Sequence, residues 1–129
     1  MYCIIDKETS IYESFGRKAN PFDPRNYVVA NGLKYQNGKK TVLHKLRDST
    51  LYPTGWLDGV TCLVGHNIKF DLLYIWGRKD VQQWLKDGGR IYDTQYAEYL
   101  ITGQHNRFEN GAGDGLNLDA LSAIYGGTV

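Results

Sequence analysis

The sequence is poor in cysteine and has neither a long apolar run nor a strong excess of charge. Its two cysteines, Cys3 and Cys62, lie in apolar strand-like runs, so reduced buried thiols are expected rather than a disulfide. No apolar run approaches the ~20 residues that span a bilayer, and the first residues do not resemble a signal peptide. A cytoplasmic protein without a membrane partner is therefore expected. The net charge is only +1, which is not the positive excess typical of nonspecific nucleic-acid binding.

The composition is that of an ordinary globular domain. Of the 129 residues, 42% are hydrophobic and 22% are charged, which is enough apolar material for a substantial core. Local basic groups occur at residues 17–18, 39–40 and 45–47, and such groups are usually solvated surface. No repeat and no linker divides the chain, so residues 1–129 are expected to form one domain.

Hydrophobic periodicity and turn residues predict three successive strands, followed by strands that alternate with helices. Strands are expected at residues 2–6, 27–35, 40–46, 60–64 and 90–92. Helices are expected at residues 70–76, 81–85, 94–101 and 117–124. Asn37-Gly38 favours a hairpin between the second and third strands. The order predicts an α/β fold with a mixed sheet: a hairpin-bearing set of strands one to three, parallel strands four and five, and helices on both faces.

Two carboxylates end the first apolar run, in the stretch YCIIDKETS at residues 2–10. Side chains alternate along a strand, so Asp6 and Glu8 are expected to point to one face and Lys7 to the other. Two interpretations remain open at this point. The carboxylates could be a solvated strand end, or they could be ligands of a divalent cation, since hard oxygen ligands suit Mg²⁺ or Mn²⁺.

A second group of polar residues lies in LVGHNIKFDLLYIW at residues 63–76. Gly65 allows a sharp turn after the fourth strand, and His66 and Asn67 follow it. Asp71 lies near the start of the next helix, where the positive end of the helix dipole favours a carboxylate. Asp71 could serve only that purpose, or it could reach a metal ion while the Asn67 amide holds a polar group of a substrate.

Together these motifs resemble those of the DEDD-type 3′–5′ exonucleases. The stretch IIDKET looks like their first motif, D-x-E-T, and GHNIKFDL resembles their second motif, N-x3-D after a strand. The stretches IYDTQYAEYLITGQ and LNLDALSAIYG resemble the segments that follow in the proofreading domains of family-A DNA polymerases, especially phage ones. The resemblance covers nearly the whole chain, with the motifs in the right order.

The resemblance implies a ribonuclease H-like fold and hydrolysis of phosphodiesters at DNA 3′ ends by two Mg²⁺ or Mn²⁺ ions. It implies that the catalytic metal ligands are Asp6, Glu8 and Asp71. It places Thr9, Ser10, His66 and Asn67 at the terminal nucleotide. The implied partners are single-stranded DNA 3′ ends and a DNA polymerase domain in the same chain or another, in the host cytoplasm if the protein comes from a phage. Asp93 matches a family aspartate that is interpreted as a helix cap.

The family also uses a fourth carboxylate, in a Tyr-x3-Asp or His-x3-Asp motif expected after LSAIYG, and residues 1–129 do not contain it there. His105 and Glu109 have a similar spacing but come too early, inside a glycine-rich loop. The chain is therefore expected to be the N-terminal part of such a domain, lacking its C-terminal segment. The alternative is a catalytically incomplete module that binds nucleic acid or docks a partner protein. A glycosidase fits poorly, because carboxylates on one strand face do not flank a sugar ring.

Overall fold

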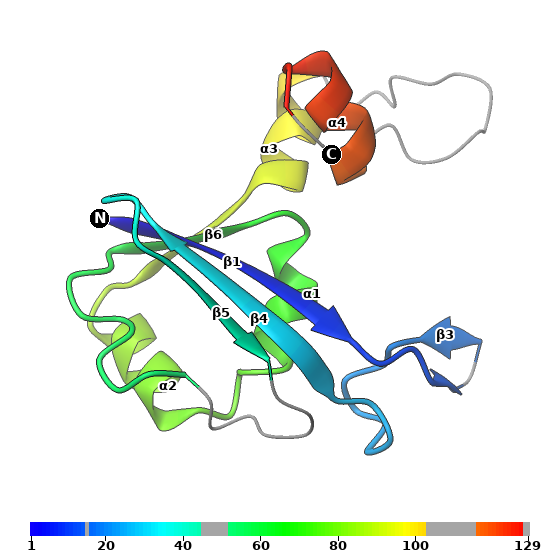
Figure 1. Ribbon diagram of the computed structural model, residues 1–129, viewed down its shortest axis with the longest axis horizontal. Coiled ribbons are helices and arrows are strands. Elements are labelled where there is room, and N and C mark those ends of the chain that lie inside the picture. The colour runs from blue at the N-terminus through cyan, green and yellow to red at the C-terminus, as the bar shows by residue number, and fades with distance from the viewer. Residues whose placement is uncertain (15, 45–51, 103–115, 128–129) are drawn as a thin grey trace.

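The computed structural model describes residues 1–14, 16–44, 52–102 and 116–127, and these residues form an α/β fold on a five-stranded mixed sheet (Figure 1). The sheet strands are β1 (Tyr2–Thr9), β4 (Val28–Tyr35), β5 (Lys40–His44), β6 (Cys62–Gly65) and β7 (Arg90–Asp93). They lie in the order β5-β4-β1-β6-β7. Two short strands, β2 (Glu13–Ser14) and β3 (Arg17–Lys18), form a separate antiparallel pair.

The strand directions agree with the predicted mixed sheet. Strand β1 pairs antiparallel with β4, and β4 pairs antiparallel with β5. On its other side β1 pairs parallel with β6, which pairs parallel with β7. The predicted hairpin turn is confirmed, because Gly38 has a φ of +88° and its N–H donates to the Tyr35 carbonyl at 2.9 Å. The predicted 40–46 strand extends beyond the described residues.

Two strands have a boundary that differs from the prediction by more than one residue. Strand β1 continues to Thr9 rather than ending at Asp6, because its backbone pairing with β4 continues past the apolar run. Strand β6 begins at Cys62 rather than at residue 60. The N–H of Val60 instead donates to the Leu57 carbonyl at 3.0 Å, so residue 60 belongs to a turn. Apolar patterning therefore located these strands but did not set their ends, which depend on the neighbouring strand.

The helices are α1 (Ile68–Leu73), α2 (Lys79–Lys86), α3 (Thr94–Ile101) and α4 (Leu118–Ile124). Helices α1 and α2 lie on one side of the sheet, while α3 leads away from β7 and packs beside α4 (Figure 1). Asp93 caps α3 by accepting from the backbone N–H of Gln95 at 2.9 Å, which confirms its interpretation as a cap. No helix in the described residues is long and apolar enough to cross a membrane.

The hydrophobic core lies between the sheet and the helices α1 and α2. Alternate residues of the strands point into it, and buried apolar residues of the two helices complete it. Its fully or nearly fully buried members include Cys3, Ile5, Leu33, Leu63, Ile68 and Val81. Each such side chain contributes roughly 1.5–3 kcal/mol by leaving water. The opposite sheet face keeps exposed side chains, among them Tyr2, Ile4 and Tyr92.

The two cysteines are free, and we expect them to differ sharply in reactivity. Tyr2 pairs with Cys62 and Cys3 pairs with Leu63, so the thiols lie on neighbouring strands but point to opposite faces. Cys3 is fully buried, and burial raises its pKa to about 11. In a colorimetric thiol titration without reductant, only Cys62 should react in the native protein, and both thiols should react after denaturation. Finding no free thiol after denaturation would contradict this.

Candidate metal centre

Asp6 and Glu8 share one face of β1, as the alternation of strand side chains predicts. Both are exposed, while Ile5 and Lys7 between and beside them are buried on the core side. In the pairing with β4, Asp6 lies opposite Gly32 and Glu8 lies opposite Ala30. The register shifts between Glu8 and Thr9, and such irregularities commonly end regular pairing next to functional sites. The two carboxylates therefore lie at the end of the regular strand.

Asp71 approaches the same part of β1 from the core side. It lies in the first turn of α1 and is only 4% exposed. Burial raises the pKa of Asp71 to about 6, the positive charge of Lys7 lowers it, and the negative charge of Asp6 raises it. Backbone N–H groups of Lys7 and of Asp71 itself also lower it. Asp71 is therefore placed beside the Asp6–Lys7 segment, far from both in the sequence.

The chemistry of this group fits a divalent cation better than its present geometry does. Among the described residues, no three His, Cys, Asp or Glu side chains are grouped closely enough to hold a metal ion. Asp71 nevertheless is a buried carboxylate that forms no ion pair with another described residue. Such a charge is costly unless a cation compensates for it. Asp6 and Asp71 are the pair whose negative charges lie near each other, and Glu8 is the further oxygen donor on the same strand.

Lys7 is a part of this region whose surroundings could not be derived from the sequence. It is 6% exposed, and its Nζ donates to Asn31 Oδ1 at 2.8 Å and also bonds to the Tyr52 hydroxyl. The Tyr52 hydroxyl donates to Asn31 Oδ1 at 2.9 Å. Burial lowers the pKa of Lys7 to about 8, although Asp71 and Asp6 raise it. Lys7 therefore supplies positive charge on the core side of β1, behind the carboxylates. The alternation of side chains along β1 predicted that Lys7 points inward, but not which residues surround it.

The ring of His66 links three segments of the chain through hydrogen bonds. Its Nε2 donates to the Leu116 carbonyl at 2.7 Å, and its Nδ1 forms a hydrogen bond with the Thr94 hydroxyl at 2.9 Å. These bonds join the end of β6 to the start of α3 and to Leu116, two residues before α4. With both ring nitrogens engaged, His66 positions this corner of the molecule.

Asn67 has a different arrangement from that of His66. It adopts a left-handed conformation with a φ of 54° and precedes α1, but its side chain does not cap the helix. Its backbone N–H donates to Asp93 Oδ1 at 3.0 Å. The Asn67 side chain is exposed and forms no hydrogen bond with the described residues, so its amide is accessible to a ligand.

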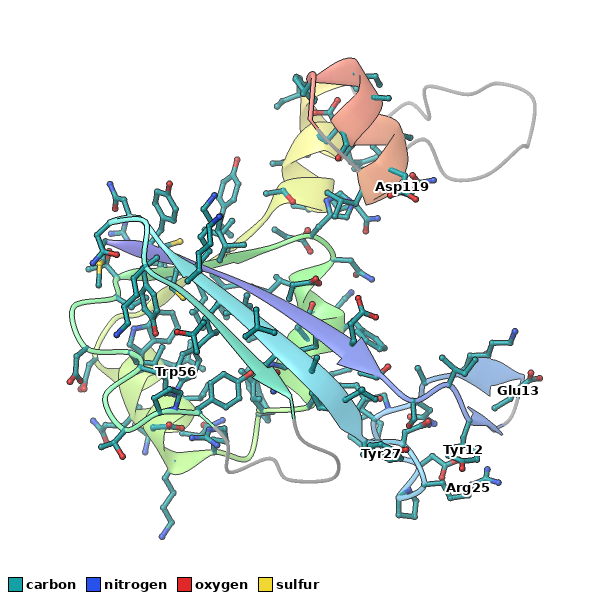
Figure 2. The ribbon with its side chains drawn as sticks, viewed as in Figure 1. Tyr12, Glu13, Arg25, Tyr27, Trp56 and Asp119 are labelled. Carbon is teal, nitrogen blue, oxygen red and sulfur yellow. The ribbon has the colours of Figure 1, made fainter. Side chains whose placement is uncertain are left out.

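Thr9 and Ser10 are tied to their surroundings. The Ser10 hydroxyl donates to Asn26 Oδ1 at 3.0 Å and accepts from the Tyr27 N–H at 2.9 Å. Thr9 forms a side-chain hydrogen bond with Tyr74. Figure 2 shows Tyr27 where this loop leaves the sheet, with further loop side chains beyond it. The geometry therefore gives Ser10 a structural function in closing the loop.

Two glycines beside the carboxylates should respond differently to substitution. A Cβ at Gly65 would lie 2.9 Å from Ile68 Cγ1 and 3.2 Å from the Ile5 carbonyl oxygen, whereas a Cβ at Gly32 would meet only the Asp6 carbonyl oxygen at 3.8 Å. We expect Gly65→Ala to lower the free energy of unfolding by about 1–3 kcal/mol through overpacking. The control Gly32→Ala should leave it unchanged or slightly raised. Urea unfolding followed by circular dichroism measures both, and equal effects would contradict the prediction.

The comparisons with known proteins add no relative. A scan against protein-family models found no match, and a search of the curated proteins found none either.

Proposed function

We propose that this chain carries a metal-dependent 3′–5′ exonuclease domain of the DEDD type, which removes nucleotides from DNA 3′ ends. One observation carries the proposal: the buried Asp71 of α1 lies beside the Asp6–Lys7 segment of β1. These are the aspartates of the D-x-E and N-x3-D motifs, so two separate motif matches meet in space. Chance matches have no reason to meet in this way.

The sheet supports the same proposal. Counted along the main sheet, the strands lie in the order third, second, first, fourth, fifth, with the first strand in the centre. That order, with a hairpin before the parallel strands, is compatible with a ribonuclease H-like fold. It puts the end of β6, Gly65, beside Ile5 of β1, one residue before Asp6, and α1 follows β6 directly. The ends of parallel strands are a common place for sites in α/β proteins.

In the proposed site, Asp6, Glu8 and Asp71 hold the divalent ions. When bound, such ions activate a water molecule and stabilise the leaving 3′ oxygen. The protein contributes the placement of the carboxylates, with Lys7 as a fixed positive charge behind them. The exposed Asn67 amide is available to hold the terminal nucleotide. A single-stranded 3′ end suits the site, because the last base must leave its stack to reach the carboxylates.

A second candidate is a module that binds nucleic acid or a partner protein without catalysis. It is favoured by the absence of a three-ligand metal group among the described residues. The residues that could stand in for a fourth carboxylate, Glu109 and Asp114, lie outside the described residues, as does His105. A DNA polymerase domain in the same or another chain would then supply much of the DNA binding.

The two candidates are separated by following a 5′-labelled single-stranded oligodeoxynucleotide with Mg²⁺ or Mn²⁺ present. We expect stepwise shortening from the 3′ end by a longer polypeptide that adds a Tyr-x3-Asp or His-x3-Asp motif, and very slow shortening by residues 1–129. Binding of Mn²⁺ to residues 1–129 is measured separately by electron paramagnetic resonance. If neither polypeptide shortens DNA although DNA binds, the noncatalytic module is correct. If neither metal nor DNA binds, the exonuclease and the nucleic-acid-binding module are both wrong, and only the module that binds a partner protein is left.

A further inference from the structure

We propose that the exposed face of β4 and β5 is the surface along which the single DNA strand approaches the candidate metal centre. Lys34 and Lys40 would contact its phosphates, and a nucleotide would lie over Gly32. This inference rests on the proposed function, because it needs the strand to end at Asp6 and Glu8.

The strand register places these residues on the same face as the carboxylates. Asp6 pairs with Gly32, and the neighbouring exposed residue of β1 pairs with Lys34. In turn, Lys34 pairs with Lys40 across β4 and β5. Directly paired residues project to the same side of a sheet, as do residues two apart. The burial pattern agrees, because Lys34 and Lys40 are exposed while Leu33 is buried in the core.

The pairing of the two lysines is unfavourable for the isolated fold. Cβ atoms of directly opposed residues lie about 4.5–5.5 Å apart, and like charges at that distance destabilise a sheet. Neither Lys34 nor Lys40 forms an ion pair or a side-chain hydrogen bond with another described residue. An anionic ligand would remove this repulsion. The phosphates of a nucleic acid provide such an anion.

Gly32 is a second and independent indication of a ligand. Its backbone does not require glycine, because its φ is not positive and an added Cβ would have only an ordinary contact at 3.8 Å. Glycine inside a strand weakens it, and it often marks a place where a ligand approaches the backbone closely. Ala30, opposite Glu8, is the next residue on this face and is also small. The strand beside both carboxylates thus leaves room for a sugar or base.

A single nucleic-acid strand fits this combination better than a protein partner does. The surface offers unpaired positive charge next to the carboxylates, and its exposed apolar side chains are Tyr2 and Ile4 of β1 and Val42, which pairs with Gly32. A docked protein would have to compensate for both signs of charge at once. A strand whose phosphates contact the lysines, and whose end reaches the cation site, satisfies both.

The test measures binding of a fluorescein-labelled single-stranded oligodeoxythymidylate to residues 1–129, by fluorescence anisotropy with Ca²⁺ present and over a series of salt concentrations. The first variant combines Lys34→Gln with Lys40→Gln. Its matched control combines Lys79→Gln with Lys86→Gln, two exposed lysines of α2 on the other side of the sheet. The second variant is Gly32→Val, which places a side chain that is favourable in strands where the nucleotide is proposed to lie.

We expect the Lys34/Lys40 variant to bind roughly tenfold more weakly and to lower the slope of log K against log salt by about 1.4, the value for two lost phosphate contacts on a single strand. Gly32→Val should weaken binding with no change in that slope, and thermal melting should show that it is folded. The control should bind like the wild type. If both test variants bind like the wild type while Asp6-dependent Mn²⁺ binding remains, this surface is wrong and the proposed function stands. If the wild type binds neither DNA nor Mn²⁺, the proposed function itself fails.

Discussion

Replacing Asp6 with alanine is expected to lower metal-dependent removal of nucleotides from DNA 3′ ends by at least about 100-fold, on the scale of losing a positioned catalytic group. Asp6 shares its strand face with Glu8, and its charge acts on the buried Asp71. It is therefore the carboxylate through which the other two would share a cation. Without it, the carboxylate that lies near Asp71 and on the same strand face as Glu8 is lost.

The measurement uses the longer polypeptide that carries the third motif, with the labelled oligonucleotide and Mn²⁺ binding as two separate readouts. Glu13→Ala is the matched control, because Glu13 is an exposed carboxylate on the short β2–β3 pair, away from the candidate centre (Figure 2). We expect the control to retain both activities. If Asp6→Ala retained Mn²⁺ binding and nucleotide removal, the assignment of this carboxylate would be wrong.

Replacing Asp71 with asparagine is expected to stabilise the metal-free protein at neutral pH by roughly 1–3 kcal/mol, while it abolishes metal binding. Burial raises the pKa of Asp71 from its ordinary value of 3.8 to about 6, so holding this carboxylate ionised in the folded protein costs free energy. Asparagine has a similar shape and no charge to desolvate. The gain lies below the full electrostatic value because the buried amide also needs hydrogen-bond partners.

The pH dependence gives the sign of this effect. Between pH 3.8 and about 6 the folded protein keeps the Asp71 proton and the unfolded chain has lost it. The contribution of Asp71 to the free energy of unfolding therefore falls as the pH rises through this window, and it stays constant above it. Urea unfolding in the presence of a chelator should show the wild type and Asp71→Asn diverging across the same window. Glu13→Gln is the control and should follow the wild type.

Divalent cations provide the complementary measurement. Mn²⁺ at about 100 times its dissociation constant would stabilise the wild type by about 2.7 kcal/mol, provided it binds only the folded state. Asp71→Asn should show no such stabilisation. If Asp71→Asn instead destabilised the protein at every pH and left the response to Mn²⁺ intact, Asp71 would be a structural residue of α1.

Much of the architecture could be predicted from local sequence. The apolar runs located the five strands of the main sheet, and Asn37-Gly38 located its hairpin. Alternation along a strand was enough to put Asp6 and Glu8 on one face. The identity of Asp93 as a cap followed from its place before a helical pattern. These properties depend on the backbone geometry of a few consecutive residues, which residue types influence directly.

The surroundings of the candidate site were decided by the tertiary structure. Alternation along β1 predicts that Lys7 points away from the carboxylates. Its hydrogen-bond partners, Asn31 and Tyr52, are 24 and 45 residues away and could not be predicted. The place of His66 at the nucleotide stays a prediction, and the structure adds its hydrogen bonds to Thr94 and to Leu116, 50 residues on. Hydrogen-bond partners and desolvation depend on which distant segments pack together. The sequence of one segment does not specify these partners or this burial. In the unfolded chain the side chain of a lysine or histidine is hydrated, and only the packing of distant segments takes it out of water.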